Sequence, residues 1–361
     1  MRNTLGTLFT LTTFGESHGE AIGGIIDGMP SGVEVDLEFI RQQLQRRRPG
    51  QSKLTSARQE ADEVKILSGV FEGKTSGTPI AFSVNNTDAH TDDYASLRHI
   101  YRPSHADYTF QQKYGLRDYR GGGRSSARIT LSRVVGGAFA RLALRRYGIS
   151  VSAFTSQVGD IRMPLDLAHT LPDLSGVEQT PVRCPDPVLA EQMAALIARV
   201  RAAGDTVGGV VTGIVRGCPP GLGEPEFSKL QASLAAAMMS INAAKGFDYG
   251  SGFDGLPYLG SQLNDPWTTD AGGHIRPLTN HSGGIQGGIS NGADLYFRVA
   301  FKPVPTLLRD QTTVDDSGRP TVVHAKGRHD PCVVPRAVPI VEAMAAMVVL
   351  DQLLIWRAQQ G

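Results

Sequence analysis

Five segments of the chain place apolar residues at helical spacing and carry start or stop signals for a helix. The predicted helices span residues 36–48, 125–148, 186–204, 227–245 and 339–357, with Asp36, Ser125 or Ser126, and Asp186 as N-caps. The last two segments are apolar on most faces. Helices of that kind are covered on several sides, so we expect both to lie inside the protein.

Shorter segments between the helices have strand-like composition, at residues 23–27, 63–70, 80–85, 208–216, 294–301 and 321–324. Together the two patterns indicate an α+β fold with long buried helices between sheets. No linker or low-complexity tract divides the sequence, so we expect one domain over residues 1–361. Residues 25–32 are echoed by residues 214–221, which favours an internal pseudo-two-fold repeat over a chance similarity of strand-turn-helix units.

Composition narrows the class of protein. The net charge of +1 gives no overall field that would attract nucleic acid or membrane. Cys184, Cys218 and Cys332 are far apart and odd in number, which predicts neither a disulfide framework nor a metal knuckle. The first 14 residues lack a continuous apolar run, and the apolar stretch 343–356 is short and contains Asp351. We therefore expect a cytoplasmic protein without a membrane span.

Basic residues are concentrated between Arg98 and Arg146, where eleven Arg and Lys face only two acids. Such a block is a solvated face, a polyanion track, or the wall of a site for a multiply charged small molecule. Residues 120–128 favour the last, because they join three glycines to a Ser-capped helix start. Free N–H groups and arginine side chains at such a turn would bind an oxyanion.

Two histidines lie in unusual surroundings: His18 stands among glycines in residues 14–19, and His105 borders the basic block. Neither has a partner at metal-ligand spacing, so we expect no metal site. The function that remains for these two side chains is proton transfer near neutral pH. Bound anions beside them would raise the pKa of a histidine.

Residues 327–332 place Asp330 beside Arg328 and His329, either as a surface salt bridge or as a carboxylate base held among cations. The loops 283–288 and 302–306 are either ordinary turns or openings for a planar cofactor or a phosphate.

Three of these segments, in order, resemble the signatures of the chorismate synthase family. The first is residues 14–19 with Gly28 and Pro30, the second is residues 123–130 with Val134 and Gly137, and the third is residues 328–332 followed by Glu342. The resemblance extends from about residue 3 to residue 359, although no motif matches between residues 150 and 185.

The resemblance implies a lyase that performs an anti-1,4-elimination of phosphate from 5-enolpyruvylshikimate 3-phosphate, giving chorismate in the shikimate pathway. It implies reduced FMN (FMNH2) as cofactor without net redox change, and a β-α-β sandwich with antiparallel sheets, assembled as a homotetramer. Because no dinucleotide motif for NADPH follows a strand and opens a helix, we expect an external flavin reductant.

The resemblance also implies residue roles. His18, helped by Ser17, would protonate the departing phosphate; His105 would stabilise the protonation state of the flavin; and Asp330 would assist removal of the C6 hydrogen. The positions that match FMN contacts are Arg124, Ser125, Ser126, Asn242, Ala243, Gly287, Lys302, Pro303, Val304, Pro305, Thr306 and Arg328. Those that match substrate contacts are Arg47, Arg48, Lys53, Arg128 and Arg336. The family often has Arg at the position of Lys53, and Lys keeps the charge without the planar fork.

Two other functions compete with this one. A nucleic-acid-binding protein would use the basic block and bind in a salt-sensitive way, but the near-neutral charge and the lack of a zinc finger or RNP motif count against it. A flavin oxidoreductase would leave net reducing equivalents in its product.

Overall fold

The computed structural model describes residues 3–50, 62–86, 97–324 and 330–360, and its strands include two five-stranded sheets. The N-terminal sheet has the order β1 (Thr4–Leu5), β2 (Thr10–Gly15), β3 (Ala21–Asp27), β7 (Ile80–Asn85) and β4 (Val64–Ile66). The C-terminal sheet has the order β11 (Ala244–Tyr249), β16 (Leu295–Phe301), β10 (Gly209–Arg216), β8 (Ser150–Val158) and β9 (Ile161–Arg162). Neighbouring strands in both sheets pair antiparallel.

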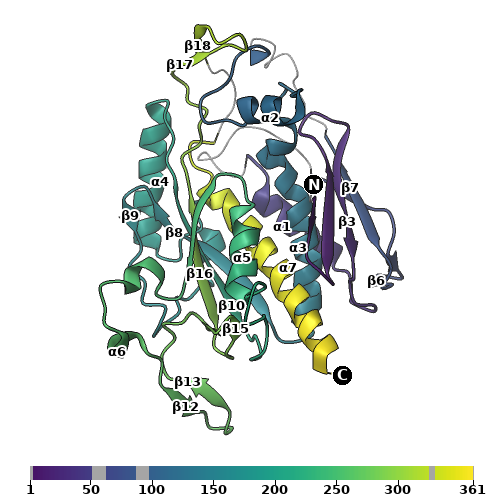
Figure 1. Ribbon diagram of the computed structural model, residues 1–361, viewed down its shortest axis with the longest axis vertical. Helices are drawn as coiled ribbons and strands as arrows, with labels where there is room; N and C mark the ends of the chain where they lie inside the picture. The colour runs from purple at the N-terminus through teal and green to yellow at the C-terminus, as the bar shows by residue number, and fades with distance from the viewer. Residues whose placement is uncertain (1–2, 51–61, 87–96, 325–329, 361) are drawn as a thin grey trace.

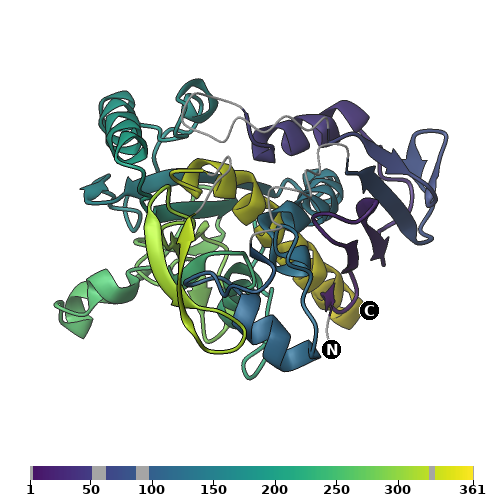
Figure 2. The same ribbon diagram turned by 90° about the horizontal axis from the view of Figure 1, so that it is seen from above.

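Helices fill the space between the sheets (Figures 1 and 2). α3 (Thr130–Arg145) contacts β2 and β3, α7 (Val334–Gln360) contacts β8 and β10, and the two helices pack against each other. Gly137 permits their close approach, because a Cβ at this position would lie 2.3 Å from the Cβ of Ala343. α1 (Leu37–Arg47) packs on both helices, and α5 (Leu230–Met239) packs on α7.

Smaller elements surround this core. They are the helices α2 (Asp107–Tyr114), α4 (Pro187–Ala202) and α6 (Gly260–Leu263); the strand pairs β5 (Val70–Phe71) with β6 (Lys74–Thr75), β12 (Trp267–Thr269) with β13 (Ile275–Pro277), β14 (Ile285–Gln286) with β15 (Ile289–Ser290), and β17 (Asp310–Val314) with β18 (Pro320–His324); and 3₁₀ turns at Gly123–Ser125, Ala127–Ile129, Val177–Gln179 and Gly252–Gly255.

Two predicted helices are confirmed together with their caps. Asp36 accepts a hydrogen bond from the backbone N–H of Phe39 at the start of α1, and Asp186 accepts from Val188 and Leu189 at the start of α4. Such caps satisfy N–H groups that the first turn of a helix leaves without a partner.

Three predicted helices have different bounds from those expected. Ser126 caps the 3₁₀ turn Ala127–Ile129, and α3 begins only at Thr130. The segment 227–245 holds the shorter α5, because Ala243 adopts a left-handed φ of 68° and the chain then pairs with β16 as β11. α5 also buries only one stripe of side chains, so the expectation that this helix would be covered on several sides was wrong.

α7 begins five residues earlier than predicted and contains Pro339. A proline inside a helix lacks the N–H that would bind the carbonyl four residues before it. Arg183 supplies that hydrogen bond instead, with its Nη1 atom 2.6 Å from the carbonyl oxygen of Pro335. With these bounds the helix is long and apolar enough to cross a membrane, whereas the stretch 343–356 alone was expected to be too short. However, 89% of its most apolar 18-residue window is buried within the protein.

The predicted strands correspond to β3, β4 with β5, β7, β10, β16 and β18, whereas β2, β8 and β11 were not predicted. Both halves of the suspected repeat continue a central strand, β3 or β10, into a turn and then a helix. In these turns Gly28, Gly32, Gly217 and Gly221 all have positive φ. The two strand-turn-helix units therefore match each other, whereas a two-fold relation between the halves of the chain stays a prediction.

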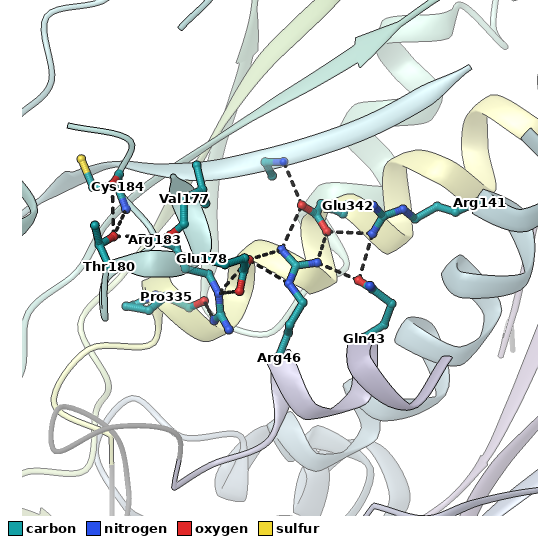
Figure 3. A network of polar contacts seen from close by, with 11 residues as sticks. Gln43, Arg46, Arg141, Val177, Glu178, Thr180, Arg183, Cys184, Pro335 and Glu342 are labelled. Carbon is teal, nitrogen blue, oxygen red and sulfur yellow. Dashed lines mark hydrogen bonds and ion pairs between the residues drawn. The ribbon is translucent and has the colours of Figure 1, made fainter. Parts of the chain in front are cut away.

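A buried ion network fixes α1 against α7 and α3 (Figure 3). The Glu342 carboxylate accepts hydrogen bonds from Arg46, from Arg141 at 2.9 Å and from the backbone N–H of Ala153 at 3.0 Å. Arg46 also pairs with Glu178, which in turn pairs with Arg183. Burial alone would raise the pKa of Glu342, but the two guanidinium groups lower it overall. The carboxylate therefore remains ionised inside the protein.

Replacing Glu342 with Gln should destabilise the fold by about 3–5 kcal/mol, because the partly buried Arg46 and Arg141 lose the buried charge that they share. Since the pKa of Glu342 is lower in the folded state than its ordinary value of 4.5, the wild-type carboxylate stabilises the fold above that pH, and this contribution is lost as the pH falls below it. Urea denaturation between pH 3 and pH 7 measures both effects.

The matched control is Glu38→Gln on the exposed face of α1, where the partner Arg41 is also exposed. An equal loss of stability in both variants would contradict the structural importance of the buried network.

Candidate active site

The loop between β2 and β3 carries Ser17 and His18, and both side chains are buried. The His18 Nδ1 atom lies 3.1 Å from the Ser17 hydroxyl. Gly121 covers the ring, with φ at +66°, and a Cβ at this position would lie 2.2 Å from the His18 Cε1 atom. The glycine-rich loop predicted to bind an oxyanion therefore packs directly on the histidine predicted to transfer a proton.

Two of the predicted substrate arginines meet next to this loop. Arg47 comes from the last turn of α1 and Arg128 from the 3₁₀ turn Ala127–Ile129, and both are buried. One oxygen of Asp62 accepts from the Arg47 Nη2 atom at 2.7 Å, and the other accepts from Arg128. Arg128 also donates to the Asn86 side chain at 3.1 Å.

A third predicted arginine completes this group. Arg336 pairs with Asp330, and its Nε atom donates to the backbone carbonyl of Arg47 at 2.9 Å. Arg48 caps α1 with extended backbone and donates its N–H to the carbonyl of Leu44. The predicted substrate residues Arg47, Arg48, Arg128 and Arg336 thus gather where α1, α7 and the glycine-rich loop meet.

Predicted cofactor residues form a neighbouring group. The Asn242 side chain donates to the carbonyl of Ser125 at 2.7 Å, and the backbone N–H of Lys302 donates to the carbonyl of Ala243 at 3.0 Å. The His105 Nε2 atom lies 2.9 Å from the Thr306 hydroxyl. The Lys302 ammonium donates to the carbonyl of Ser104 at 3.1 Å, so the His105 loop and the 302–306 loop face each other.

Positive charge in this second group is not balanced within the described part of the chain. Arg124, Arg133, Lys245 and Lys302 form no ion pair with a carboxylate there. Burial, together with Arg124, lowers the pKa of Arg133 to about 10. Burial and the neighbouring Lys245 lower the pKa of Lys302. Cations that face one another in this way are typical of a site that takes an anionic ligand.

Some predicted residues lie elsewhere or outside the described chain. Gly287 is in the β14–β15 turn, which contacts the start of α5, whereas Asn242 follows the end of that helix. Val304 and Pro305 accept hydrogen bonds through their carbonyls from Thr206 and Gln311. Lys53 and Arg328 fall in segments that the structure does not describe. Among the described residues, no group of three or more His, Cys, Asp or Glu could hold a metal ion.

The site thus contains an arginine cluster, a buried histidine and a cation-rich loop. The family model described as chorismate synthase matches residues 9–354. The chain belongs to the chorismate synthase family. The chorismate synthase of Bacteroides fragilis is 59% identical over 360 residues, and that of Cytophaga hutchinsonii is 56% identical over 351 residues.

These alignments cover all of this chain and all of the B. fragilis protein, and 97% of this chain and of the C. hutchinsonii protein. A solved structure described as chorismate synthase superimposes with a TM-score of 0.77 at 31% identity, over 97% of this chain and 92% of the other. The sequence similarity to chorismate synthases assigns the chain to the chorismate-forming step of the shikimate pathway.

Five polar residues of the site were not predicted, and two of them are the cations Arg133 and Lys245 of the second group. Asp62 bridges two arginines, Asn86 holds the His18 loop through the carbonyls of Glu16 and Gly19, and Asp118 lies close enough to His18 to be affected by its charge. Asp62 and Asn86 flank the paired strands β4 and β7, and only that pairing brings them to the site. Their positions in the sequence carry no comparable signal.

Replacing Gly121 with Ala should reduce kcat for chorismate formation about a hundredfold, since the new methyl group displaces the His18 ring from its proton-transfer position. Gly115→Ala is the matched control, because Gly115 has a similar φ of +70° but open space around its missing Cβ. Steady-state kinetics of both variants separates the clash from the backbone strain. Equal kcat losses would show that His18 does not depend on this contact.

Proposed function

We propose that this chain eliminates phosphate from 5-enolpyruvylshikimate 3-phosphate by an anti-1,4-elimination that requires reduced FMN but causes no net redox change. The observation that carries the proposal is that the loop of a buried histidine, His18, is linked through Asn86 to the buried pair Arg47 and Arg128. The substrate has a phosphate and two carboxylates, and arginine binds such groups through paired hydrogen bonds. The cluster and His18 therefore suit a leaving phosphate that needs both charge stabilisation and a proton.

The residues of the second group fit FMN. FMN has a phosphate, and Arg124, Arg133, Lys245 and Lys302 provide positive charge without a carboxylate partner in the described chain. Asn242, Ser125 and Thr306 add neutral polar groups beside these cations. We infer that these residues, with Ser126, Ala243 and the 302–306 loop, would hold the cofactor. Reduced FMN would supply the electron density that makes phosphate a better leaving group.

Around that cofactor the protein residues would perform the proton steps. His18 would donate a proton to the departing phosphate oxygen, and the Ser17 hydroxyl beside Nδ1 would fix the orientation of the ring. His105, held by Thr306, would stabilise the protonation state of the flavin. Asp330 would assist removal of the C6 hydrogen, and its pairing with Arg336 would fix the carboxylate next to the substrate arginines.

We further infer a cytoplasmic homotetramer of chains that each form one β-α-β sandwich domain with an internal pseudo-two-fold repeat, supplied with reduced flavin by an external reductant. The inference of assembly is supported by a run of exposed apolar side chains around α6 and the β12–β13 hairpin, which extends from the body of the protein (Figure 1). They are Phe253, Leu256, Tyr258, Leu259, Trp267, Ile275 and Leu278. An exposed apolar surface of this kind marks an interaction site.

The reaction is tested by an anaerobic assay of the purified chain with the substrate and chemically reduced FMN. The proposal predicts that chorismate and phosphate appear in equal amounts while the flavin stays reduced. Flavin oxidation in step with turnover would instead favour a flavin oxidoreductase. Salt-sensitive binding of RNA or DNA, without binding of FMN or substrate, would favour a nucleic-acid-binding protein.

His18→Ala and His105→Ala should each reduce kcat by about a hundred- to ten-thousand-fold, the usual range for loss of a general acid or base. FMN binding is measured in parallel to confirm that the site remains intact. His169→Ala, at a half-exposed histidine that pairs with Asp166, is the control. Near-normal turnover by both site variants with FMN bound would exclude the proton-transfer roles.

The assembly is tested by light scattering of the wild-type chain and of the double variant Trp267→Ser, Ile275→Ser. The wild type should have four times the mass of the 38.6 kDa chain, and the variant should be smaller because its interface loses apolar contacts. Val188→Ser replaces an exposed apolar residue on α4 and should leave the mass unchanged. A monomeric wild type would overturn the tetramer.

A further inference from the structure

Asp62 occupies the centre of the predicted substrate site. Its carboxylate is buried between Arg47 and Arg128, and each of its two oxygens accepts from a different guanidinium group. Arg47 has only 1% of its surface exposed, so solvent cannot compensate its charge. The carboxylate thus contacts both buried cations at once.

Repulsion among the arginines gives this contact its importance. Burial, together with the nearby Arg336 and Arg128, lowers the pKa of Arg47 to about 10, although Asp62 acts in the opposite direction. Two buried guanidinium groups without an anion between them would move apart or draw in water. Asp62 therefore sets the distance between the two arginines before any ligand binds.

Arg47 keeps donors that Asp62 does not use. Asp62 contacts only the Nη2 atom of Arg47, whereas a guanidinium group carries five N–H donors. The Arg47 Nε atom is buried and has no hydrogen-bond partner in the described part of the chain. A buried N–H without a partner is costly, and an incoming oxyanion would satisfy it.

Arg128 connects this pair to the catalytic histidine. Its Nε atom donates to the Asn86 side-chain oxygen, and the Asn86 amide donates to the carbonyls of Glu16 and Gly19 at 3.0 and 2.8 Å. These two carbonyls flank Ser17 and His18. The position of Arg128 is therefore coupled through one side chain to the position of the proton donor.

We propose that Asp62 is a positioning residue of the substrate site, which stays in place when the ligand binds and holds Arg47 and Arg128 at the spacing that the anionic groups of the substrate require. This inference rests on the proposed function in assigning the ligand. It goes beyond that function in assigning an acidic residue to the recognition of an acidic substrate. The competing possibility is that Asp62 occupies the place of the substrate anion and must be displaced.

The two possibilities predict opposite changes in KM. Asp62→Asn keeps the shape of the side chain but removes its charge, so the positioning role predicts a KM for 5-enolpyruvylshikimate 3-phosphate raised roughly ten- to a hundredfold. The kcat should change less than the KM, since Asn86 and not Asp62 contacts the His18 loop directly. Displacement by the substrate predicts a lower KM, and a lower or unchanged KM overturns the proposal.

Asp62→Glu is the second variant. It keeps the charge but is one methylene longer, so its KM should lie between those of the wild type and Asp62→Asn. If Asp62→Asn does not fold, the Glu variant decides alone, and an unchanged KM overturns the proposal. Asp254→Asn is the matched control, because Asp254 also bridges two arginines, Arg162 and Arg298, but is half-exposed. It follows the C-terminal end of β11, whereas Ala243 of the site precedes the N-terminal end of that strand.

Isothermal titration calorimetry with inorganic phosphate compares anion binding by the wild type and Asp62→Asn without requiring turnover. The wild type should bind phosphate more tightly than Asp62→Asn, whether or not it converts the proposed substrate. Failure of the wild type to form chorismate would count against the proposed function alone. Equal or tighter phosphate binding by Asp62→Asn, or none by the wild type, would count against the positioning role.

Discussion

Two consecutive arginines at the end of α1 connect the stability of the fold to its site. Successive side chains on a helix point about 100° apart, so Arg46 and Arg47 face different surroundings. Arg46 pairs with Glu342 and Glu178, which fixes α1 against α7. Arg47, one position further, pairs with Asp62 inside the site. Because the first pairing fixes the end of the helix, the second arginine is presented at a defined place.

The site separates its cations into two groups. Arg47, Arg128 and Arg336 pair with the internal carboxylates Asp62 and Asp330. The cations near Asn242 and Lys302 have no carboxylate partner in the described chain. An arginine that is paired with a carboxylate is held in a fixed position and can still donate N–H groups to a ligand. Cations without a carboxylate partner provide net positive charge instead. The first arrangement suits recognition of a shaped polyanion, and the second suits a terminal phosphate such as that of FMN.

The sequence predicted the elements with strong local signals. Asp36 and Asp186 were correct caps because a capping side chain acts within its own turn. The strand β8 was missed, since its polar Thr155 and Ser156 become buried only between neighbouring strands. The start of α7 was missed for a similar reason: Arg183, 152 residues earlier, satisfies the carbonyl that Pro339 leaves without a helical partner. In the site, glycine-rich loops marked His18 and Arg124, but Asp62 and Asn86 have their roles only through the pairing of β4 with β7.

The most direct test of this account is a crystal structure of the chain with oxidised FMN and 5-enolpyruvylshikimate 3-phosphate bound together. The account predicts the substrate phosphate within hydrogen-bond distance of His18 and of Arg47 or Arg128, with the FMN phosphate among Arg124, Arg133, Lys245 and Lys302. It also predicts that Asp62 still bridges its two arginines. Substrate bound away from His18, or an FMN phosphate bound away from those four cations, would contradict it.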